Sequence, residues 1–258
     1  MPPMTIRVGV LGAGGRMGAT VCDAVAADDE LDLVAAVDPF TVGRTVQGIE
    51  ITDDLERMLA DGVDVVVDFT TAEAARRNLP LLAAAGVHAV VGTTGFDAAD
   101  LDRFEADFRT SGVLVAANFA IGAVLMMRFA ELAAPFFETV EVIELHHDQK
   151  LDAPSGTAMT TVERIAAASD RWGEDPTRSE LLPGARGGVG PAGVHVHSVR
   201  LRGLVAHQEV LFGAAGQLLT VRHDSFDRVS FMPGVVLAAK RIVTTTGLTR
   251  GLEPLLGI

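Results

Sequence analysis

The beginning of the chain restricts its fold more than any other part. Ile6–Leu11 (IRVGVL) has the apolar composition of a short buried strand, and the glycine-rich segment GAGGRMG, residues 12–18, follows at once. A helical pattern over Met17–Ala27 comes next, and then a second strand pattern, Leu31–Val37, which ends in Asp38. A strand, a glycine turn, a helix and a strand closed by an acid together predict a Rossmann-type dinucleotide-binding domain.

The glycine spacing departs from the usual G-x-G-x-x-G, because Met17 stands where the third glycine is expected. The segment fits G-x-x-G-x-x-G instead, through Gly12, Gly15 and Gly18. The physical requirement is the same in both cases. Residues without a Cβ let the backbone approach a pyrophosphate, which then lies at the N-terminus of a helix.

Asp38 also bears on the choice of cofactor. A carboxylate at the end of the second strand accepts hydrogen bonds from the ribose hydroxyls of NADH and repels the 2′-phosphate of NADPH. Pro39 and Phe40 come next, and no basic residue follows before Arg44. This favours NADH. Use of NADPH as well stays open, since Arg16 in the turn could reach a 2′-phosphate.

Strands and helices continue to alternate after this pair. Val63–Phe69, Val87–Val91 and Val113–Ala117 are strand patterns, and Ala72–Ala85 is a helix pattern that stops at Gly86. Small or hydroxyl residues follow each strand, namely Thr70 and Thr71, then Gly92 to Gly95, then Asn118. We therefore expect a parallel sheet with ligand-binding loops at its carboxyl edge.

A second segment rich in chemistry is Glu144–Thr157, which reads ELHHDQKLDAPSGT. It places His146, His147 and Lys150 before a Pro-Ser-Gly-Thr turn. The preceding residues from Thr139 form a β-branched strand pattern, and Ala158–Trp172 is a helix pattern with Ser155 as its candidate N-cap. The helix N-terminus would then face these basic side chains, which predicts an anion site.

The pattern changes after Phe119. Thr139–His147, Gly193–Phe212 and Gln217–Arg222 are predicted as longer strands, the last two joined by a Gly-Ala-Ala-Gly turn. The Gly- and Pro-rich stretch Glu174–Pro191 is expected to be a long loop. These features predict a second, α+β domain with an open mixed or antiparallel sheet, so the fold class is α/β with two domains.

The remaining histidines offer a weaker signal. His195 and His197 alternate in a strand and so share one face, which would supply half a metal site. No cysteine or carboxylate close in sequence completes it, so no metal is expected. A satisfied polar sheet face or a subunit interface is the alternative for these two and for His207. Arg200 and Arg202 are expected to be structural or solvated.

Composition limits the partners. The chain has 258 residues, an apolar fraction of 48% and a formal net charge of −13. The negative charge argues against nucleic acid or an anionic membrane as partner, and Arg128, Glu131 and Pro135 interrupt the most apolar helical run. The only cysteine, Cys22, excludes an intramolecular disulfide and favours the cytoplasm. MPPMTIR leads directly into a strand, without room for a signal peptide.

Five motifs together carry a resemblance to a known family. They are GAGGRMG, DFT at residues 68–70, GTTG at residues 92–95, ANF at residues 117–119 and ELHHDQKLDAPSGTA from Glu144. In this order, over nearly the whole chain, they resemble dihydrodipicolinate reductase. The resemblance implies NAD(P)H-dependent reduction of 4-hydroxy-tetrahydrodipicolinate, a cyclic dicarboxylate, with loss of water, in diaminopimelate and lysine biosynthesis. It also implies a cytoplasmic homotetramer.

The resemblance also implies roles for individual residues. It implies that His146 and Lys150 transfer protons. It also implies that a substrate carboxylate is bound by His147, Ser155, Gly156 and Thr157. Cofactor contacts fall to Gly12, Ala13, Gly14, Gly15, Arg16, Met17, Asp38, Gly92, Thr93, Thr94, Ala116, Ala117, Asn118, Phe119, Arg228 and Phe231. The C-terminal segment returns to the first domain, so the implied domains are 1–118 with 226–258 for the dinucleotide, and 119–225 for substrate and oligomerisation.

Two other functions fit the same glycine turn. One is a different Rossmann oxidoreductase, such as a sugar or semialdehyde dehydrogenase; the lack of a cysteine near a substrate loop argues against the semialdehyde type. The other is a non-catalytic NAD-sensing module, which would not need His146 and Lys150 beside an anion site.

Overall fold

A computed structural model describes residues 5–258; the four residues before them, part of the segment on which the signal-peptide expectation rests, lie outside this range. The chain forms two compact units. The first contains the chain up to Ile121 together with Arg228–Ile258, and the second is Gly122–Asp227.

The first unit is built on an eight-stranded sheet in the order β13-β7-β6-β5-β1-β2-β4-β3. Every pairing is parallel except that of β3 with β4. The strands are β1 (Ile6–Leu11), β2 (Leu31–Val37), β3 (Thr45–Val46), β4 (Ile49–Thr52), β5 (Val65–Asp68), β6 (His88–Val91), β7 (Gly112–Val115) and β13 (Gly247–Arg250). The chain leaves β1 for β2 on one side and reaches β5 on the other. The loops after these parallel strands therefore meet at a topological switch point.

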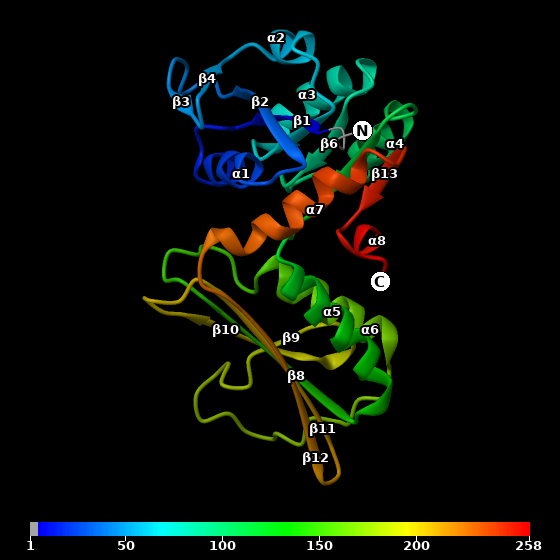
Figure 1. Ribbon diagram of the computed structural model, residues 1–258. Helices are drawn as coiled ribbons and strands as arrows, with labels where there is room; N and C mark the ends of the chain where they lie inside the picture. The colour runs from blue at the N-terminus through cyan, green and yellow to red at the C-terminus, as the bar shows by residue number, and fades with distance from the viewer. Residues whose placement is uncertain (1–4) are drawn as a thin grey trace. The chain divides into compact units, whose positions relative to one another are not determined.

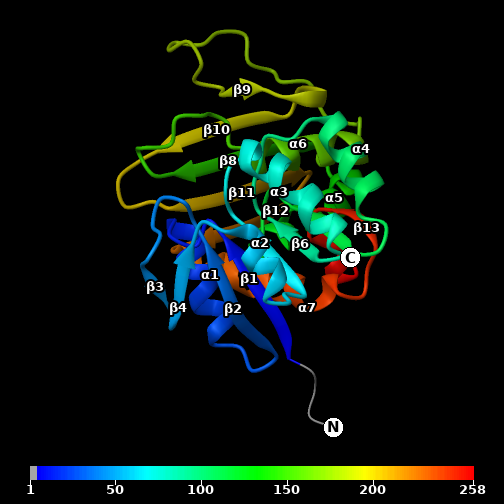
Figure 2. The same ribbon diagram turned by 90° about the horizontal axis from the view of Figure 1, so that it is seen from above.

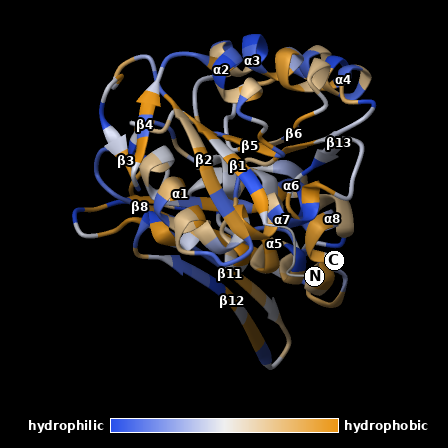
Figure 3. Ribbon diagram, turned by 45° about the horizontal axis from the view of Figure 1, so that its top comes forward, coloured by the Kyte–Doolittle hydropathy of each residue, from blue (hydrophilic) through white to orange (hydrophobic). Residues whose placement is uncertain are grey.

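Helices cover both faces of this sheet (Figure 1). On one face lie α1 (Arg16–Ala26) and α7 (Met232–Ile242), and on the other lie α2 (Leu55–Ala60), α3 (Ala72–Ala84) and α4 (Ala98–Asp107). The short helix α8 (Glu253–Leu256) follows β13. The buried strands read as continuous apolar runs, and Figure 3 shows β1 and β2 mostly in the hydrophobic colour. Val65, Val66 and Val67 are each 0% exposed.

The second unit has a five-stranded sheet in the order β12-β11-β8-β10-β9. Its strands are β8 (Thr139–His146), β9 (Gly188–Val189), β10 (His195–Arg200), β11 (Ala206–Ala214) and β12 (Gln217–Ser225). Strand β8 pairs parallel with β10 and antiparallel with β11, as their side-by-side course in Figure 2 shows. The sheet is therefore mixed and open, as expected.

Two helices, α5 (Ile121–Ala133) and α6 (Gly156–Ala168), supply the other side of the second unit's core. Val142 of β8, Val210 of β11 and Ile165 of α6 are all fully buried there. In β8, Val140, Val142, Glu144 and His146 share the helix-covered face because side chains alternate along a strand. This placement puts Glu144 and His146 beside the start of α6.

Some predicted elements differ from the structure. Gly193–Phe212 is not one strand: it divides into β10 and β11 at a turn in which Gly203 has φ +91° and Leu204 N–H bonds to Leu201 O. The helix predicted as Ala158–Trp172 starts at Gly156 and ends at Ala168. Trp172 still packs against the same core from the following loop. The sequence patterns also missed β3, β4, β9, β13, α2, α4 and α8.

Within residues 5–258, no helix has both the length and the apolar character needed to cross a membrane. The apolar run that begins at Ile121 is instead α5, whose Ala123, Val124, Met126, Met127 and Ala130 are buried in the protein.

Candidate active site

The turn between β1 and α1 is shaped by close backbone contacts. Gly12 has φ +79°, and a Cβ there would lie 2.9 Å from Phe69 O. A Cβ on Gly18 would lie 2.0 Å from Gly12 O, which no side chain could tolerate. Gly12 and Gly18 therefore let the chain reverse tightly and let α1 pack directly on the end of β1. These are two of the three glycines of the predicted spacing.

The same turn has features that suit a pyrophosphate. The N-cap of α1 is Gly15, and no side chain caps the helix, so its first-turn N–H groups are offered to an anion. Thr41 lies against Gly14, since a Cβ on Gly14 would meet its Oγ1, and that buried hydroxyl has no hydrogen-bond partner among the described residues. The residues present therefore fit a dinucleotide.

Asp38 lies beside this turn and is only 6% exposed. Its Oδ2 accepts a hydrogen bond from Gly14 N at 3.0 Å, and its Oδ1 accepts one from Phe40 N at 2.9 Å. The carboxylate thus fixes the glycine turn relative to β2. Each oxygen keeps a further lone pair that can accept from a ribose hydroxyl. Phe40, 94% exposed, follows directly.

The other predicted cofactor residues lie in loops after β6 and β7 at the same edge of the sheet. Gly92–Thr94 follows β6 and Ala116–Phe119 follows β7. Several of these side chains are buried: Thr93 is 6% exposed, and Phe119, at 2%, packs on Phe69 with ring centroids 5.7 Å apart. Arg228 and Phe231 bound a 3₁₀ turn, Arg228–Phe231, which contacts α1 and leads into α7.

The sequence reasoning gave no role of its own to Asp68, the last residue of β5. Asp68 is 0% exposed, and its Oδ1 accepts from Thr70 N at 2.8 Å and Thr70 Oγ1 at 2.6 Å. Burial raises the pKa of this carboxyl above its usual value, against the opposing effect of hydrogen bonds from Thr70 and Thr93. Asp68 therefore holds the loop after β5 in place through its hydrogen bonds with Thr70.

The predicted anion site lies at the start of α6 in the second unit. Ser155 is the N-cap, as predicted, and its Oγ accepts from Ala158 N at 3.2 Å. Gly156 is exposed, and a Cβ added there would meet nothing within 4 Å. The fold itself therefore does not require glycine at this position. The N–H of Gly156 lies in the first turn, where a helix supplies no acceptor of its own.

Glu144 is the centre of the hydrogen bonds in this region, and the sequence reasoning did not single it out. Its side chain is 0% exposed; it contacts His146 Nδ1 at 2.5 Å and accepts from Arg200 at 2.8 and 2.7 Å and from Ser155 N at 3.2 Å. Burial alone would raise the pKa of Glu144, but hydrogen bonds from His146, Arg200 and Ser198 outweigh it and hold the pKa at about 2. Glu144 is therefore a buried carboxylate anion.

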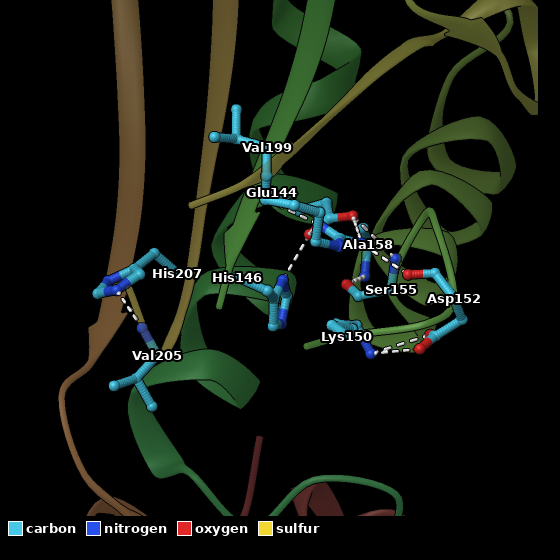
Figure 4. Close-up of polar contacts among 10 residues, drawn as sticks. Glu144, His146, Lys150, Asp152, Ser155, Ala158, Val199, Val205 and His207 are labelled. Atoms are coloured by element: carbon cyan, nitrogen blue, oxygen red, sulfur yellow. Dashed lines mark hydrogen bonds and ion pairs between the residues drawn. The ribbon is translucent and has the colours of Figure 1, made fainter. Parts of the chain in front are cut away.

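His146, Lys150 and Ser155 lie around one region in Figure 4. Lys150 Nζ donates to the two carboxylate oxygens of Asp152 at 2.8 and 2.9 Å, and hydrogen bonding by Lys150 is the main cause that lowers the pKa of Asp152. His147 is not part of this group: it is exposed, and its Nδ1 accepts from Gln149 N at 3.2 Å.

The three histidines of β10 and β11 have acidic partners. His195 contacts Asp175 at 3.1 Å, His197 contacts Glu141 at 2.6 Å, and His207 contacts Asp224 at 2.7 Å. Within the described residues, no three His, Cys, Asp or Glu side chains gather in a way that could hold a metal ion.

The two arginines of β10 and its following turn differ. Arg202 is solvated, with 91% of its side chain exposed. Arg200 is structural, because its guanidinium forms a bidentate pair with the buried Glu144.

Comparison with known proteins gives a consistent result. The family models for the N-terminus and the C-terminus of dihydrodipicolinate reductase match residues 6–119 and 122–256. The chain is 56% identical over 262 residues to the 4-hydroxy-tetrahydrodipicolinate reductase of Nocardia farcinica (strain IFM 10152), which covers 99% of this chain and 100% of that protein. It is 52% identical over 263 residues to the enzyme of that name from Cutibacterium acnes (strain DSM 16379 / KPA171202), covering 98% and 99%.

A solved structure agrees over the same length. A dipicolinate-bound dihydrodipicolinate reductase from Paenisporosarcina sp. TG-14 matches with a TM-score of 0.87 at 41% identity, covering 97% of this chain and 99% of that one. An amine dehydrogenase from Mycobacterium smegmatis, at 14% identity and a TM-score of 0.65, shares the fold alone.

Proposed function

The chain belongs to the dihydrodipicolinate reductase family, and from this premise we propose which of its residues carry the reaction and which cofactor they favour. The reaction is the reduction of 4-hydroxy-tetrahydrodipicolinate to tetrahydrodipicolinate with NAD(P)H and loss of water, a step in diaminopimelate and lysine biosynthesis. A sugar dehydrogenase or a non-catalytic NAD module is not favoured.

One observation carries the assignment of the site. The buried anion Glu144 contacts His146 and the N-terminus of α6, and Lys150 lies in the loop between them. A substrate with two ring carboxylates needs cationic and N–H groups placed in this way. A relative of this chain, the enzyme from Paenisporosarcina, has been solved with dipicolinate, a planar ring with two carboxylates.

We assign the following roles. Gly156 and Thr157 at the start of α6 bind one carboxylate, and the Lys150 ammonium neutralises its charge. His147, which is exposed, would contact this carboxylate from the solvent side. The nicotinamide, when bound, supplies a hydride. As negative charge then develops on the ring, His146 and Lys150 are the residues placed to donate a proton to it. Ser155 contributes by capping α6 and fixing the direction of its first turn.

In the first unit we assign the pyrophosphate to residues 12–17 at the start of α1, and the adenosine ribose to Asp38. Gly92–Thr94 and Ala116–Phe119 would line the nicotinamide end mainly through their backbone, since Thr93, Ala116 and Phe119 are buried. Arg228 and Phe231 would also line the nicotinamide end of the cofactor.

The assay that tests the function follows oxidation of NADH in the presence of the condensation product of pyruvate and aspartate semialdehyde. Turnover separates this reductase from the two other classes. Failure to turn over that product, with the purified chain folded and binding NADH, would count against the proposal.

We predict that NADH is used at least as well as NADPH. Asp38 offers a carboxylate to the ribose, and a 2′-phosphate at the same place would meet its negative charge. Steady-state values of kcat/KM for both cofactors test this, and a strong preference for NADPH would contradict it. Arg16→Ala is the matched variant: if Arg16 serves a 2′-phosphate, only the NADPH value should fall.

We predict that pyridine-2,6-dicarboxylate competes with the substrate. Charge-assisted hydrogen bonds contribute about 1.5–3 kcal/mol each, so Thr157→Val should weaken inhibition about ten-fold or more. Gly156→Ala should act similarly through a Cβ that displaces the carboxylate. This variant is clean because nothing in the protein lies within 4 Å of that Cβ.

The controls for this prediction are Thr157→Ser, which keeps the hydroxyl and should keep the inhibition, and pyridine-2-carboxylate, which can engage only one end of the site and should bind far less well. Equal inhibition by the mono- and dicarboxylate, or inhibition that does not compete with substrate, would place the dicarboxylate site elsewhere.

We also propose a cytoplasmic homotetramer assembled through the second unit. Helices α5 and α6 cover one face of its sheet, and the edge strand β12 exposes Leu218 at 70%. Analytical ultracentrifugation tests the assembly, and a monomer at micromolar concentration would contradict it.

A further inference from the structure

Glu144 is a buried carboxylate with more partners than the compensation of its charge requires. Its two oxygens accept from both terminal nitrogens of Arg200, which already compensates the charge. The remaining contacts are to the His146 ring and to Ser155 N. The additional partners therefore belong to the end of β8 and the start of α6, which hold the proposed active site.

Arg200 extends this arrangement to the third element of the site. It lies opposite His146 in the register of β10 on β8, and its Nη2 also donates to Asp152 O at 2.7 Å. Asp152 pairs with Lys150 through its side chain. One carboxylate and one guanidinium thus connect the His146 ring, the start of α6 and the loop that carries Lys150.

We propose that Glu144, held by Arg200, is a positioning residue that fixes the ring of His146 with the proton on Nδ1, so that Nε2 is the atom that exchanges a proton with the substrate. This inference rests on the proposed function and adds the residue through which His146 acts. In the proton-transfer step the Nε2–H bond of the imidazolium breaks and the proton passes to the ring of the substrate. The neutral imidazole that remains keeps its Nδ1–H bond to Glu144.

The electrostatics support this direction of transfer. Glu144 stays ionised, because hydrogen bonds from His146, Arg200 and Ser198 hold its pKa at about 2 despite burial. It therefore orients and stabilises the imidazolium without taking its proton. The other charged groups around His146 are Arg200 on β10 and Lys150 and Asp152 in the loop; β11 presents Ala206, and the first turn of α6 has no acidic residue.

The test is a double-mutant cycle on kcat with Glu144→Gln, His146→Ala and the combined variant. Glu144→Gln keeps the shape of the side chain and should lower kcat about 10- to 100-fold, by analogy with the loss of a partner that orients a metal-binding histidine. NADH affinity should not change. In the His146→Ala background the second substitution should cost little more, because the histidine through which Glu144 acts is already absent.

The pH dependence of kcat/KM distinguishes a positioning role of Glu144 from a purely structural one, because a structural role would leave the alkaline limb of the profile unchanged. Without the anion beside it, the imidazolium is less favoured, so the alkaline limb of kcat/KM should shift to lower pH in Glu144→Gln. An unchanged limb, or additive losses in the cycle, would overturn the positioning role. A wild-type kcat in His146→Ala would instead overturn the proton-transfer role given to His146 in the proposed function, so the two failures are distinguishable.

A measurement on the unaltered chain covers the case in which Glu144→Gln does not fold. Nitrogen NMR of the imidazole rings, with His146 identified by comparison with His146→Ala, reports which nitrogen holds the proton in the neutral form. The proposal expects Nδ1. Protonation of Nε2 in the neutral ring would contradict it.

Discussion

Replacing Lys150 by alanine is expected to lower kcat by about 10²–10⁴, and His146→Ala should do the same, because this is the usual contribution of a positioned acid or base. NADH affinity should barely change, since both residues belong to the second unit and the glycine turn belongs to the first. Steady-state kinetics and NADH titration of both variants measure the two quantities. A near-normal kcat in both would remove them from the mechanism.

Two further variants sharpen this experiment. Lys150→Arg keeps the positive charge but replaces the ammonium by a group that does not release its proton, so it should retain substrate binding better than kcat. Arg202→Ala removes a cation whose side chain is 91% exposed and which pairs only at the surface with Asp148, so kcat should stay normal.

Deleting Met232–Ile258 is expected to abolish NADH binding, although these residues are far in sequence from the glycine turn. The segment forms α7 and β13, and Val235 and Ile242 of α7 are fully buried against the sheet. Each such side chain contributes about 1.5–3 kcal/mol, against a total domain stability of about 5–15 kcal/mol. Without them the first unit should not hold its fold.

Calorimetric titration of the shortened chain with NADH measures the effect, and circular dichroism shows whether loss of fold accompanies it. Removing only Gly257 and Ile258, which are exposed, is the matched control and should leave binding intact. Normal NADH binding by the longer deletion would show that the first unit is complete without its C-terminal segment.

The sequence predicted those parts of the fold that local pattern controls. β1 and β2 have the bounds predicted for them, and Ser155 is the N-cap of α6. Such elements are recognisable because buried parallel strands are continuous apolar runs and a cap side chain has a fixed spacing from its partner. The sequence also predicted that the second unit has an open mixed or antiparallel sheet, but it did not predict the register of the strands.

The missed elements depend on contacts between distant residues. β13, the short sequence GLTR, has no apolar run of its own and is a strand because it pairs with β7. Gly203, with φ +91°, divides Gly193–Phe212 into two strands, and a single glycine within an apolar pattern does not by itself predict a turn. In the site, Glu144 and Arg200 are 56 residues apart, and only the register of β10 on β8 makes them partners.

One signal for Glu144 was present in the sequence. It occupies the same alternating positions of β8 as Val140 and Val142, where an apolar side chain would be expected. An acid on the buried face of a strand needs a cation or several donors. In the sequence, the arginines that follow His195 and His197 are cations able to satisfy it.

The way the C-terminal segment completes the sheet of the first unit has a consequence for synthesis of the chain. The second unit is one continuous piece, Gly122–Asp227, and all of it has been made before α7 begins. The first unit lacks α7 and its edge strand β13 until Arg250 has left the ribosome. On a growing chain the second unit therefore has all its residues before the first unit does, although the first unit begins earlier in the sequence, and the first unit is the last to close.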